Sequence, residues 1–438
     1  MFKTLINAFK IEDIRKKLIY TFMMLIVLRI GSQLPVPGVN RDYFAAWFAA
    51  QNNGAFNFFD AFTGGSFSSM SLFALGVNPY ITSSIIVQLL TIAIPALEEM
   101  QKDGEDGKEK LQKITRYLTI VLALIEAVAM TIGFGRKGLL AEVSFINGLG
   151  VVAAFVAGSF FVMWIGERIT DKGIGNGISI VLLINIVSRM PDDFASLYQQ
   201  FMQGQSVAKA VVAAIIILAV VLLTIVLVIF LQDGVRKIPV QYAKKMQGRK
   251  MVGGQSTHIP LKVNTAGVIP VIFASSLLSF PSIIMMLLGK SAGDGIGGHI
   301  LNALSQSNWC SPSKPWYTVG LLVYILLVVF FAYFYTSITF NPLEVANNMK
   351  RQGGFVPGIR PGKPTSDYLA KILNYIIFIG AIGLIIVAVI PIFFNGVFGA
   401  SVSFGGTSLI IVVGVVLETL KQMEAQMVNR HYKGFLND

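Results

Sequence analysis

Charged residues are scarce in this 438-residue chain, and their scarcity excludes an ordinary soluble protein. Asp, Glu, Lys and Arg make up 13% of the sequence, 54% is apolar, and the mean hydropathy is +0.68. A soluble globular protein carries about 25% charged residues. The composition therefore predicts a protein of the lipid bilayer.

Cysteine and histidine are nearly absent, which excludes most chemistry that depends on them. Cys310 is the single cysteine, so no internal disulfide can form. His258, His299 and His431 are far apart and have no metal-ligand spacing. We therefore expect no enzyme, no metal site and no cofactor. We also expect no cleavable signal, because no small-residue cleavage site follows the first apolar run.

Ionisable residues are nearly missing from the apolar runs as well. Coupled transporters and ion channels usually place Asp, Glu or His at membrane depth. Glu126 is the clearest exception here, and Arg29 and Glu418 lie closer to the ends of their runs. A single glutamate without an obvious partner favours contact with a neighbouring helix or subunit. The sequence thus argues against a proton- or sodium-coupled carrier and favours a conduit opened by its cargo or partners.

Long apolar runs are the dominant feature that is present. A transmembrane helix needs about 20 mostly apolar residues. The candidate spans are 18–34, 72–97, 115–134, 149–166, 178–190, 208–231, 265–289, 316–338, 368–392 and 404–423. The fifth is short, and its length alone would also allow a buried or re-entrant segment.

The distribution of basic residues favours ten spans. If all ten cross, 27 basic residues lie on one side and 7 on the other, with Arg29 inside the first span. Without the fifth span, the seven basic residues of 232–264 would move outside, against the positive-inside tendency. We predict an all-α polytopic membrane protein of ten transmembrane helices, with both termini cytoplasmic.

Ten spans divide into two groups of five. The N-terminal half would be 1–190, the extracytoplasmic connection 191–207, and the C-terminal half 208–438. An odd number of spans per half makes the second half enter from the opposite side, as in an inverted repeat. Because pathways often lie at such an interface, we expect the functional site between the halves.

Three segments interrupt the regular pattern. The Gly/Ser/Phe-rich stretch 54–71 is too short and polar to span, so it predicts either a re-entrant helix inside the bundle or a surface loop. Ser83, Ser84 and Gln88 in the second span are either contacts between helices or the lining of a wet cavity. The run KGIGNGI at 172–178 lacks the GxGxxG spacing and a preceding strand, so it predicts a helix-capping turn.

Two cytoplasmic loops are strongly basic. Residues 232–264 hold seven basic residues against one acidic residue, and alternation over Val235–Ala243 predicts a short hairpin. Residues 341–365 combine basic residues with Gly and Pro. Such charge can serve topology alone, but its extent along both loops predicts a docking surface for ribosomal RNA phosphates or an acidic protein face. The run GKPT lacks phosphate-loop spacing, so energy would come from a partner.

Six runs spread over nearly the whole chain resemble the bacterial SecY family in order and spacing. They are RIGSQLPVPGV (29–39), FALGVNPYITSSIIVQLL (73–90), GERITDKGIGNGISI (166–180), QSTHIPLKVNTAGVIPVIFASS (255–276), NNMKRQGGFVPGIRPG (347–362) and FGGTSLIIVV (404–413).

This resemblance implies a protein-conducting channel with an hourglass pore between two five-helix halves. A re-entrant plug similar to 56–70 would close its outer side, with Phe58, Phe59, Phe62, Gly64 and Gly65 as plug residues. The waist would be a ring of the aliphatic side chains Val77, Ile81, Ile178, Leu182, Ile272 and Ile411. The family often has isoleucine at the positions of Val77 and Leu182, and both replacements remain aliphatic.

The resemblance also implies a lateral gate, where the second and third spans face the seventh and eighth. Signal sequences and transmembrane segments would leave there into lipid. Candidate polar groups of the gate are Ser83, Ser84, Gln88, Ser275 and Ser276.

Partners follow from the same resemblance. The cytoplasmic loops 232–264 and 338–367 would dock the motor ATPase SecA and the ribosome, through Arg236, Lys237, Arg249, Lys250 and Arg360. SecE-like and SecG-like small membrane subunits, secretory and membrane protein substrates, and the lipid bilayer complete the expected partners. The expected location is the bacterial cytoplasmic (inner) membrane. An inverted-repeat secondary transporter and a non-conducting scaffold that recruits ribosomes remain alternatives.

Overall fold

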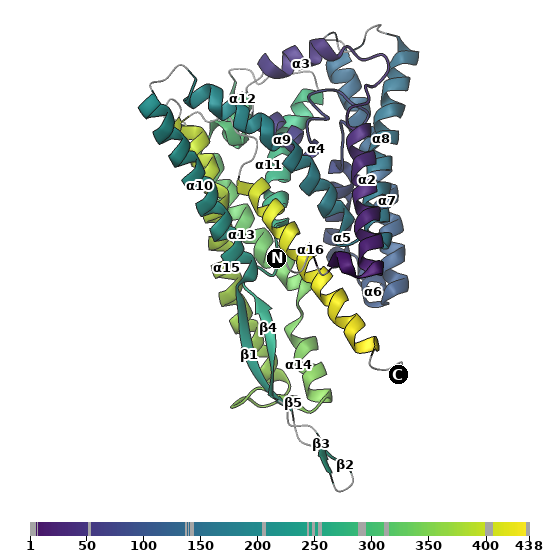
Figure 1. Cartoon of the computed structure of the whole chain (residues 1–438), viewed down its shortest axis with the longest axis vertical. Helices are drawn as coiled ribbons and strands as arrows, with labels where there is room; N and C mark the ends of the chain where they lie inside the picture. Colours follow the sequence, from purple (N-terminus) through teal and green to yellow (C-terminus); the bar gives the residue numbers. More distant parts are fainter. Residues whose placement is uncertain are drawn as a thin grey trace.

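The helices of this chain lie side by side in an elongated body with a β protrusion at one end (Figure 1). The structure is a computed structural model that describes residues 6, 8–50, 54–135, 138, 140, 144–203, 207–242, 245–247, 250–252, 256–287, 295–310, 315–398 and 406–434. Each of the ten predicted runs overlaps a different long helix of the described chain. These helices are α2 (Glu12–Gly31), α5 (Asn78–Ala93), α7 (Glu105–Phe134), α8 (Phe145–Lys172), α9 (Gly177–Phe201), α10 (Val207–Asp233), α11 (Ile269–Leu287), α13 (Val319–Thr339), α15 (Lys363–Phe398) and α16 (Gly406–Gly434).

The all-α polytopic fold is confirmed. Five described helices, α7, α8, α10, α13 and α15, are long and apolar enough to cross a membrane, judged by length and composition. A sixth span is the pair α5 and α6 (Pro95–Lys102), which is bent by 104°. The bend falls at Pro95, where the ring removes a backbone donor and prevents a straight continuation. This span also begins later than predicted, because residues 72–77 form turns before Asn78.

The fifth span is longer than the sequence predicted. The sequence predicted 178–190 as this span and 191–207 as the connection between the halves. In the structure α9 continues through Pro191 to Phe201. Leu197 is buried against Met190, Phe201 and residues of α10, and this packing stabilises the extension despite the proline.

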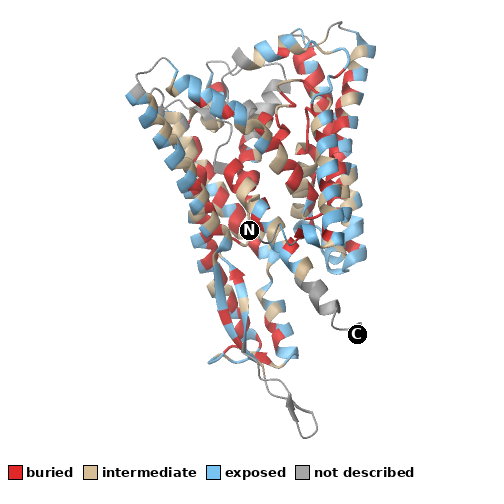
Figure 2. Ribbon diagram, in the orientation of Figure 1, coloured by how far each residue is buried: buried red, intermediate tan, exposed pale blue. Residues whose placement is uncertain are grey.

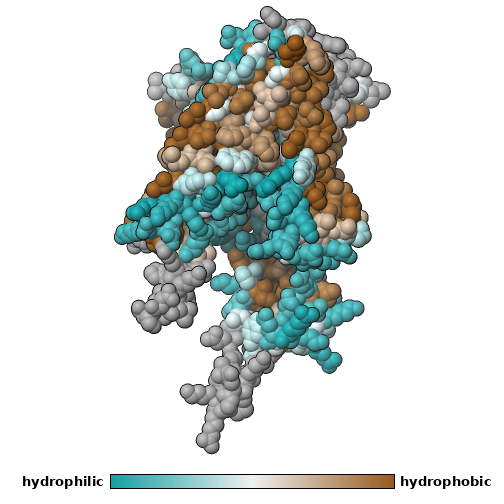
Figure 3. Space-filling model, turned by 90° about the vertical axis from the view of Figure 1, so that its right-hand side faces the viewer, coloured by the Kyte–Doolittle hydropathy of each residue, from teal (hydrophilic) through white to brown (hydrophobic). Residues whose placement is uncertain are grey.

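Apolar side chains lie both inside the bundle and on its outer surface. Buried residues follow the contacts between helices (Figure 2). Large apolar residues also face outward, among them Leu218 of α10 and Leu326 of α13, exposed by 61% and 69%. One face of the molecule shows a broad hydrophobic region bordered below by hydrophilic residues (Figure 3). The bilayer can cover this surface, since lipid is as apolar as the side chains themselves.

The two basic loops meet in one β protrusion. Strand β1 (Val235–Tyr242) pairs with β4 (Ser256–Lys262), with Ile238 opposite Ile259, and this confirms the predicted hairpin. A short strand from the second loop, β5 (Gly354–Phe355), pairs with the other edge of β1 and gives the order β4-β1-β5. Ile238, Leu261 and Met349 are buried in a shared core with residues of α15, and Met349 belongs to α14 (Pro342–Arg351). The small hairpin of β2 (Lys245–Gln247) and β3 (Lys250–Val252) lies at the far tip (Figure 1).

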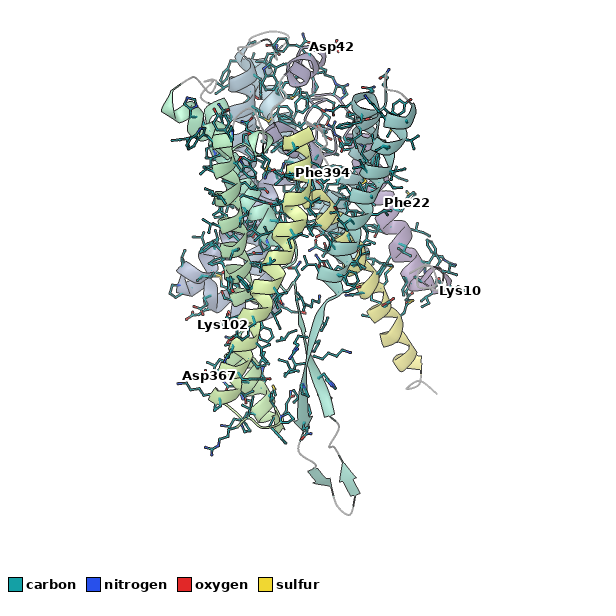
Figure 4. All side chains as sticks on the ribbon, turned by 90° about the vertical axis from the view of Figure 1, so that its left-hand side faces the viewer. Lys10, Phe22, Asp42, Lys102, Asp367 and Phe394 are labelled. Atoms are coloured by element: carbon teal, nitrogen blue, oxygen red, sulfur yellow. The ribbon has the colours of Figure 1, made fainter. Side chains whose placement is uncertain are left out.

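Segments that were predicted to share one side of the membrane share one end of the molecule. Lys10, Lys102 and Asp367 lie toward the end that carries the β protrusion, and Asp42 lies at the opposite end (Figure 4). Phe22 and Phe394 lie between these two levels. The arrangement agrees with the predicted grouping of segments, while the cytoplasmic position of the termini stays a prediction.

Candidate functional site

The six aliphatic residues predicted for the waist lie in one apolar cluster at the meeting of the two halves. Val77, Leu182, Ile272 and Ile411 are buried in it, and Ile81 and Ile178 are partly buried against it. The N-terminal half contributes residues from α5 and α9, and the C-terminal half contributes residues from α11 and α16. Residues from distant parts of the sequence therefore form a continuous apolar zone between the halves.

The tight turn before α9 sets the position of Ile178. Asn176 caps α9, because its side-chain oxygen accepts hydrogen bonds from the amides of Ile178 and Ser179 at 3.1 and 3.3 Å. Gly175 has a φ of +80°, which favours glycine. A Cβ at Gly177 would overlap the carbonyl oxygen of residue 166. The KGIGNGI run is thus a helix-capping turn, as predicted, and it fixes the start of α9, where Ile178 is the second residue.

The plug segment lies against this cluster. Helix α4 (Gly54–Thr63) is followed by turns through residues 64–71, so only the first part of the predicted re-entrant segment is helical. Phe62 is buried in the apolar cluster that holds the six predicted waist residues, from here on called the waist cluster. Phe59 packs on Phe67, with ring centroids 5.0 Å apart. Gly64 and Gly65 have φ values of +66° and +82°, so they end the helix in a left-handed turn. The side chain of Phe58 lies outside the described residues.

Charged and polar groups hold the plug segment on α9. Arg189 Nη1 lies 2.8 Å from Asp60 Oδ2, and the Asp60 side chain is fully buried. The amide of Ser68 donates to Asp60 Oδ1 at 2.8 Å, and Asn185 Nδ2 donates to the Phe62 carbonyl at 2.9 Å. In the sequence analysis, Arg189 was only one of the seven basic residues on the predicted outer side. Neither Asp60 nor Asn185 was assigned to the site.

The region predicted as a lateral gate brings the expected helices together. Helices α7 and α11 are in contact, and Ile85 of α5 packs against the core formed by α11 and α13. Two of the five candidate polar groups, however, bond within their own half. The hydroxyl of Ser83 donates to the Pro79 carbonyl of its own helix at 2.7 Å, and Gln306 donates to Ser275 Oγ at 3.2 Å. The other candidates, Ser84, Gln88 and Ser276, are partly buried.

The β protrusion presents several of the predicted docking residues. Arg236 and Lys237 are exposed on β1, and Arg360 is exposed in the second loop. The hydroxyl of Thr365 donates to the Arg360 carbonyl at 2.8 Å and holds this loop against the start of α15. Lys250 belongs to β3, but its side chain and Arg249 lie outside the described residues.

Glu126 lies on α7 with its carboxylate turned inward. Its Oε2 atom is buried and has no hydrogen-bond partner in the described part of the chain. Its helix α7 is in contact with α5, α6, α8 and α11. This placement fits the expected contact with a neighbouring helix or subunit, and Glu126 belongs to no group of three or more potential metal ligands among the described residues.

Comparisons with known proteins agree with this architecture. The SecY family model matches residues 71–420. The "Protein translocase subunit SecY" of Halalkalibacterium halodurans is 44% identical over 443 residues, and that of Bacillus subtilis is 42% identical over 446 residues, each covering 100% of both chains. The structure is similar to "The structure of a protein conducting channel", with a TM-score of 0.64, 19% identity and coverage of 94% of this chain and 93% of that one. It is also similar to "Sec61 in the Canine ribosome-channel complex from the endoplasmic reticulum", with a TM-score of 0.61, 18% identity and the same coverage.

Proposed function

The chain belongs to the SecY family, and from this we propose that it is the central pore subunit of a channel that passes unfolded polypeptides across the membrane. The observation that carries the proposal is the waist cluster, where aliphatic residues of both halves meet under Phe62 of the plug segment. The waist cluster consists of apolar side chains rather than reactive groups. Its proposed role is therefore to open and close the pore.

An apolar constriction can block ions and still pass a polypeptide. Water leaves a narrow apolar passage, and an ion would have to lose its hydration to enter it. Aliphatic side chains can move apart around an extended chain, because they hold one another only by packing. The waist residues Val77, Ile81, Ile178, Leu182, Ile272 and Ile411 are proposed to form this constriction, and α4 is proposed to close its outer side.

Lateral release would use the contact between α7 and α11. An apolar signal sequence gains about 25 cal/mol for each Å² that it moves from water to lipid. Ser83, Ser84, Gln88, Ser275 and Ser276 are proposed as polar groups of this gate. Because Ser83 and Ser275 bond within their own halves, separating the halves would break neither of these hydrogen bonds.

The β protrusion is proposed as the docking site for the SecA motor and the ribosome. Its exposed residues Arg236, Lys237 and Arg360 offer positive charge to an acidic protein face or to RNA phosphates. The shared core of the two loops makes the protrusion one body, so a partner that binds it can push on α15 directly. SecE-like and SecG-like subunits are proposed companions in the bacterial cytoplasmic membrane, with both termini of this chain cytoplasmic.

Crosslinking of a stalled secretory chain tests the pore. A photo-reactive amino acid at Ile178, Ile272 or Ile411 should label the stalled chain, whereas the same probe at Leu218 or Leu326 on the outer surface should label lipid. The reason is that the first three lie in the cluster between the halves and the last two face outward. Labelling only from Leu218 and Leu326 would contradict the pore assignment.

Charge reversal of Arg360 tests the docking site. Arg360→Glu should slow motor-driven export at least about tenfold, because a like-charge contact in an interface costs several kcal/mol. Export is measured on reconstituted vesicles at equal amounts of assembled complex. Lys110→Glu is the matched control, since Lys110 is an exposed basic residue on α7 outside the protrusion. Equal export rates in both variants would remove Arg360 from the docking site.

A further inference from the structure

The plug segment has a single acidic side chain, and this side chain is paired inside the protein. Asp60 is the only Asp or Glu within residues 54–71. Its side chain is 0% exposed, and its Oδ2 lies 2.8 Å from Nη1 of Arg189, which is 20% exposed. The contact is an ion pair without a hydrogen bond to Oδ2, and opposite charges this close attract more strongly in a buried site than in water. The ion pair therefore joins α4 to α9, next to the hydrogen bond from Asn185 Nδ2 to the Phe62 carbonyl.

Further contacts fix the same segment in the same place. Arg41 Nε donates to the Ser69 carbonyl at 2.9 Å, and Asn185 Nδ2 donates to the Phe62 carbonyl at 2.9 Å. A Cβ at Gly64 would come within 2.9 Å of the Arg29 guanidinium and 3.0 Å of Cα of Asn185. Arg41 and Arg189 of the predicted outer side, and Arg29 of the first span, all lie against the segment that follows Asp60.

Opening the channel requires this ion pair to separate. Phe62 lies two residues after Asp60 and is buried in the waist cluster, so α4 cannot leave the waist while Asp60 stays on Arg189. A buried charge that loses its partner is costly. Asp193 lies four residues after Arg189 on α9 and is also buried, so a second carboxylate stays near Arg189 when α4 departs. The pair can therefore break and re-form without leaving the arginine far from any negative charge.

We propose that the Asp60–Arg189 ion pair is a latch, meaning that it holds the plug segment in its closed position. The strength of this ion pair then sets how apolar a signal sequence must be to open the channel. This inference rests on the proposed function as a polypeptide channel. Arg189 and Asp60 are positioning residues, because they act through α4 and not on the substrate. A weakened ion pair lowers the binding energy that a signal sequence has to supply to open the channel. The export rate of precursors with weakly apolar signal sequences should therefore rise most.

The test compares two precursors in the complete complex. One precursor has an intact signal sequence, and the other has a signal with a shortened apolar core. Asp60→Asn keeps an acceptor for the Ser68 amide, and Arg189→Gln removes the charge from the other side of the pair. Each variant should raise export of the weakened precursor about tenfold and leave the intact precursor within about twofold, since only the weak signal is limited by the opening step.

The double variant distinguishes a latch from two separate defects. Removing either partner ends the same interaction, so Asp60→Asn with Arg189→Gln should exceed neither single variant. Lys209→Gln is the matched control, because Lys209 is exposed at the start of α10 and carries the same charge. Wild-type discrimination in both single variants, or a double effect equal to the product of the single effects, would overturn the latch.

A second measurement does not depend on export. Hydrogen exchange of the backbone amides in 60–69 should be faster in Asp60→Asn and Arg189→Gln than in wild type and Lys209→Gln. These amides bond within the plug segment itself, as from Gly65 to the Asp60 carbonyl, and a segment released from α9 exposes these bonds to water and opens more often. Unchanged protection in a resting complex would also overturn the latch. If the wild-type complex fails to export the intact precursor, the proposed function fails instead, and the exchange experiment still decides whether the ion pair holds the plug.

Discussion

Vesicles that hold the Ile411→Asn variant should leak ions at rest at least about ten times faster than wild-type vesicles, since a tenfold rate needs only about 1.4 kcal/mol off the barrier. Ile411 is 1% exposed and lies in the waist cluster with Ile272 and Phe62. An amide in this place binds water that an isoleucine excludes, and the retained water lowers the cost of bringing an ion into the constriction. The leak is measured as potassium or chloride efflux without precursor or motor.

Two matched variants separate hydration of the waist from general damage. Ile411→Leu keeps the volume and the apolar character, so its leak should equal that of wild type. Val416→Asn places the same amide on the outward face of the same helix, where Val416 is 40% exposed. Equal leaks from Ile411→Asn and Val416→Asn would show that the cluster does not seal the passage, and the pore proposal would lose its main support.

The apolar spans were predictable because their signals are local. A run of apolar residues is recognised from its own length, and the basic residues flanking each run indicate its side. Alternation along Val235–Ala243 predicted the hairpin in the same way, since the period of two is a property of the strand itself. The six waist residues were assigned by resemblance to the SecY family, and the structure brings them into one cluster.

The remaining features depend on contacts between distant segments. Helix α9 continues past Pro191 because Leu197 packs on α10, and nothing near Pro191 in the sequence announces that packing. Strand β5 has two residues, too few for a pattern, and it exists because β1 offers an unpaired edge. The ion pair of Asp60 and Arg189 joins the plug segment to the fifth span, and each residue alone reads as an ordinary charge near a membrane surface.

The polar residues of the gate illustrate the same limit. Sequence indicated that Ser83 and Ser275 lie in apolar spans, but not which groups they would bond. The structure gives Ser83 a partner one turn back in its own helix and gives Ser275 a partner in the outer segment of its own half. The hydroxyl of a serine in a membrane helix often donates to a carbonyl one turn back in the same helix. A serine at the contact between the two halves therefore does not imply a hydrogen bond between them.

Gly158→Ala should lower the free energy of unfolding of the complex by about 1–3 kcal/mol, the usual cost of forcing an extra group into a packed site. Gly158 lies on α8, and a Cβ there would overlap the carbonyl oxygen of Leu72. A carbonyl is backbone and cannot rotate away as a side chain can, so residues 72–77 would have to shift. These residues join the plug segment to α5 and present Val77 to the waist, and Ser159 of α8 holds them by donating to the Gly76 carbonyl at 3.2 Å. The shift should therefore also raise the resting ion leak.

Gly150→Ala is the matched control for this prediction, because it makes the same change on the same helix. A Cβ at Gly150 has no other group within 4 Å, so the only expected effect is the better helix propensity of alanine, about 1 kcal/mol or less in the stabilising direction. Thermal unfolding of the purified complexes and efflux from vesicles measure the two consequences separately. A Gly158→Ala complex that unfolds and leaks like Gly150→Ala would mean that α8 does not fix residues 72–77, and that the waist is held in place by the helices α9, α11 and α16 alone.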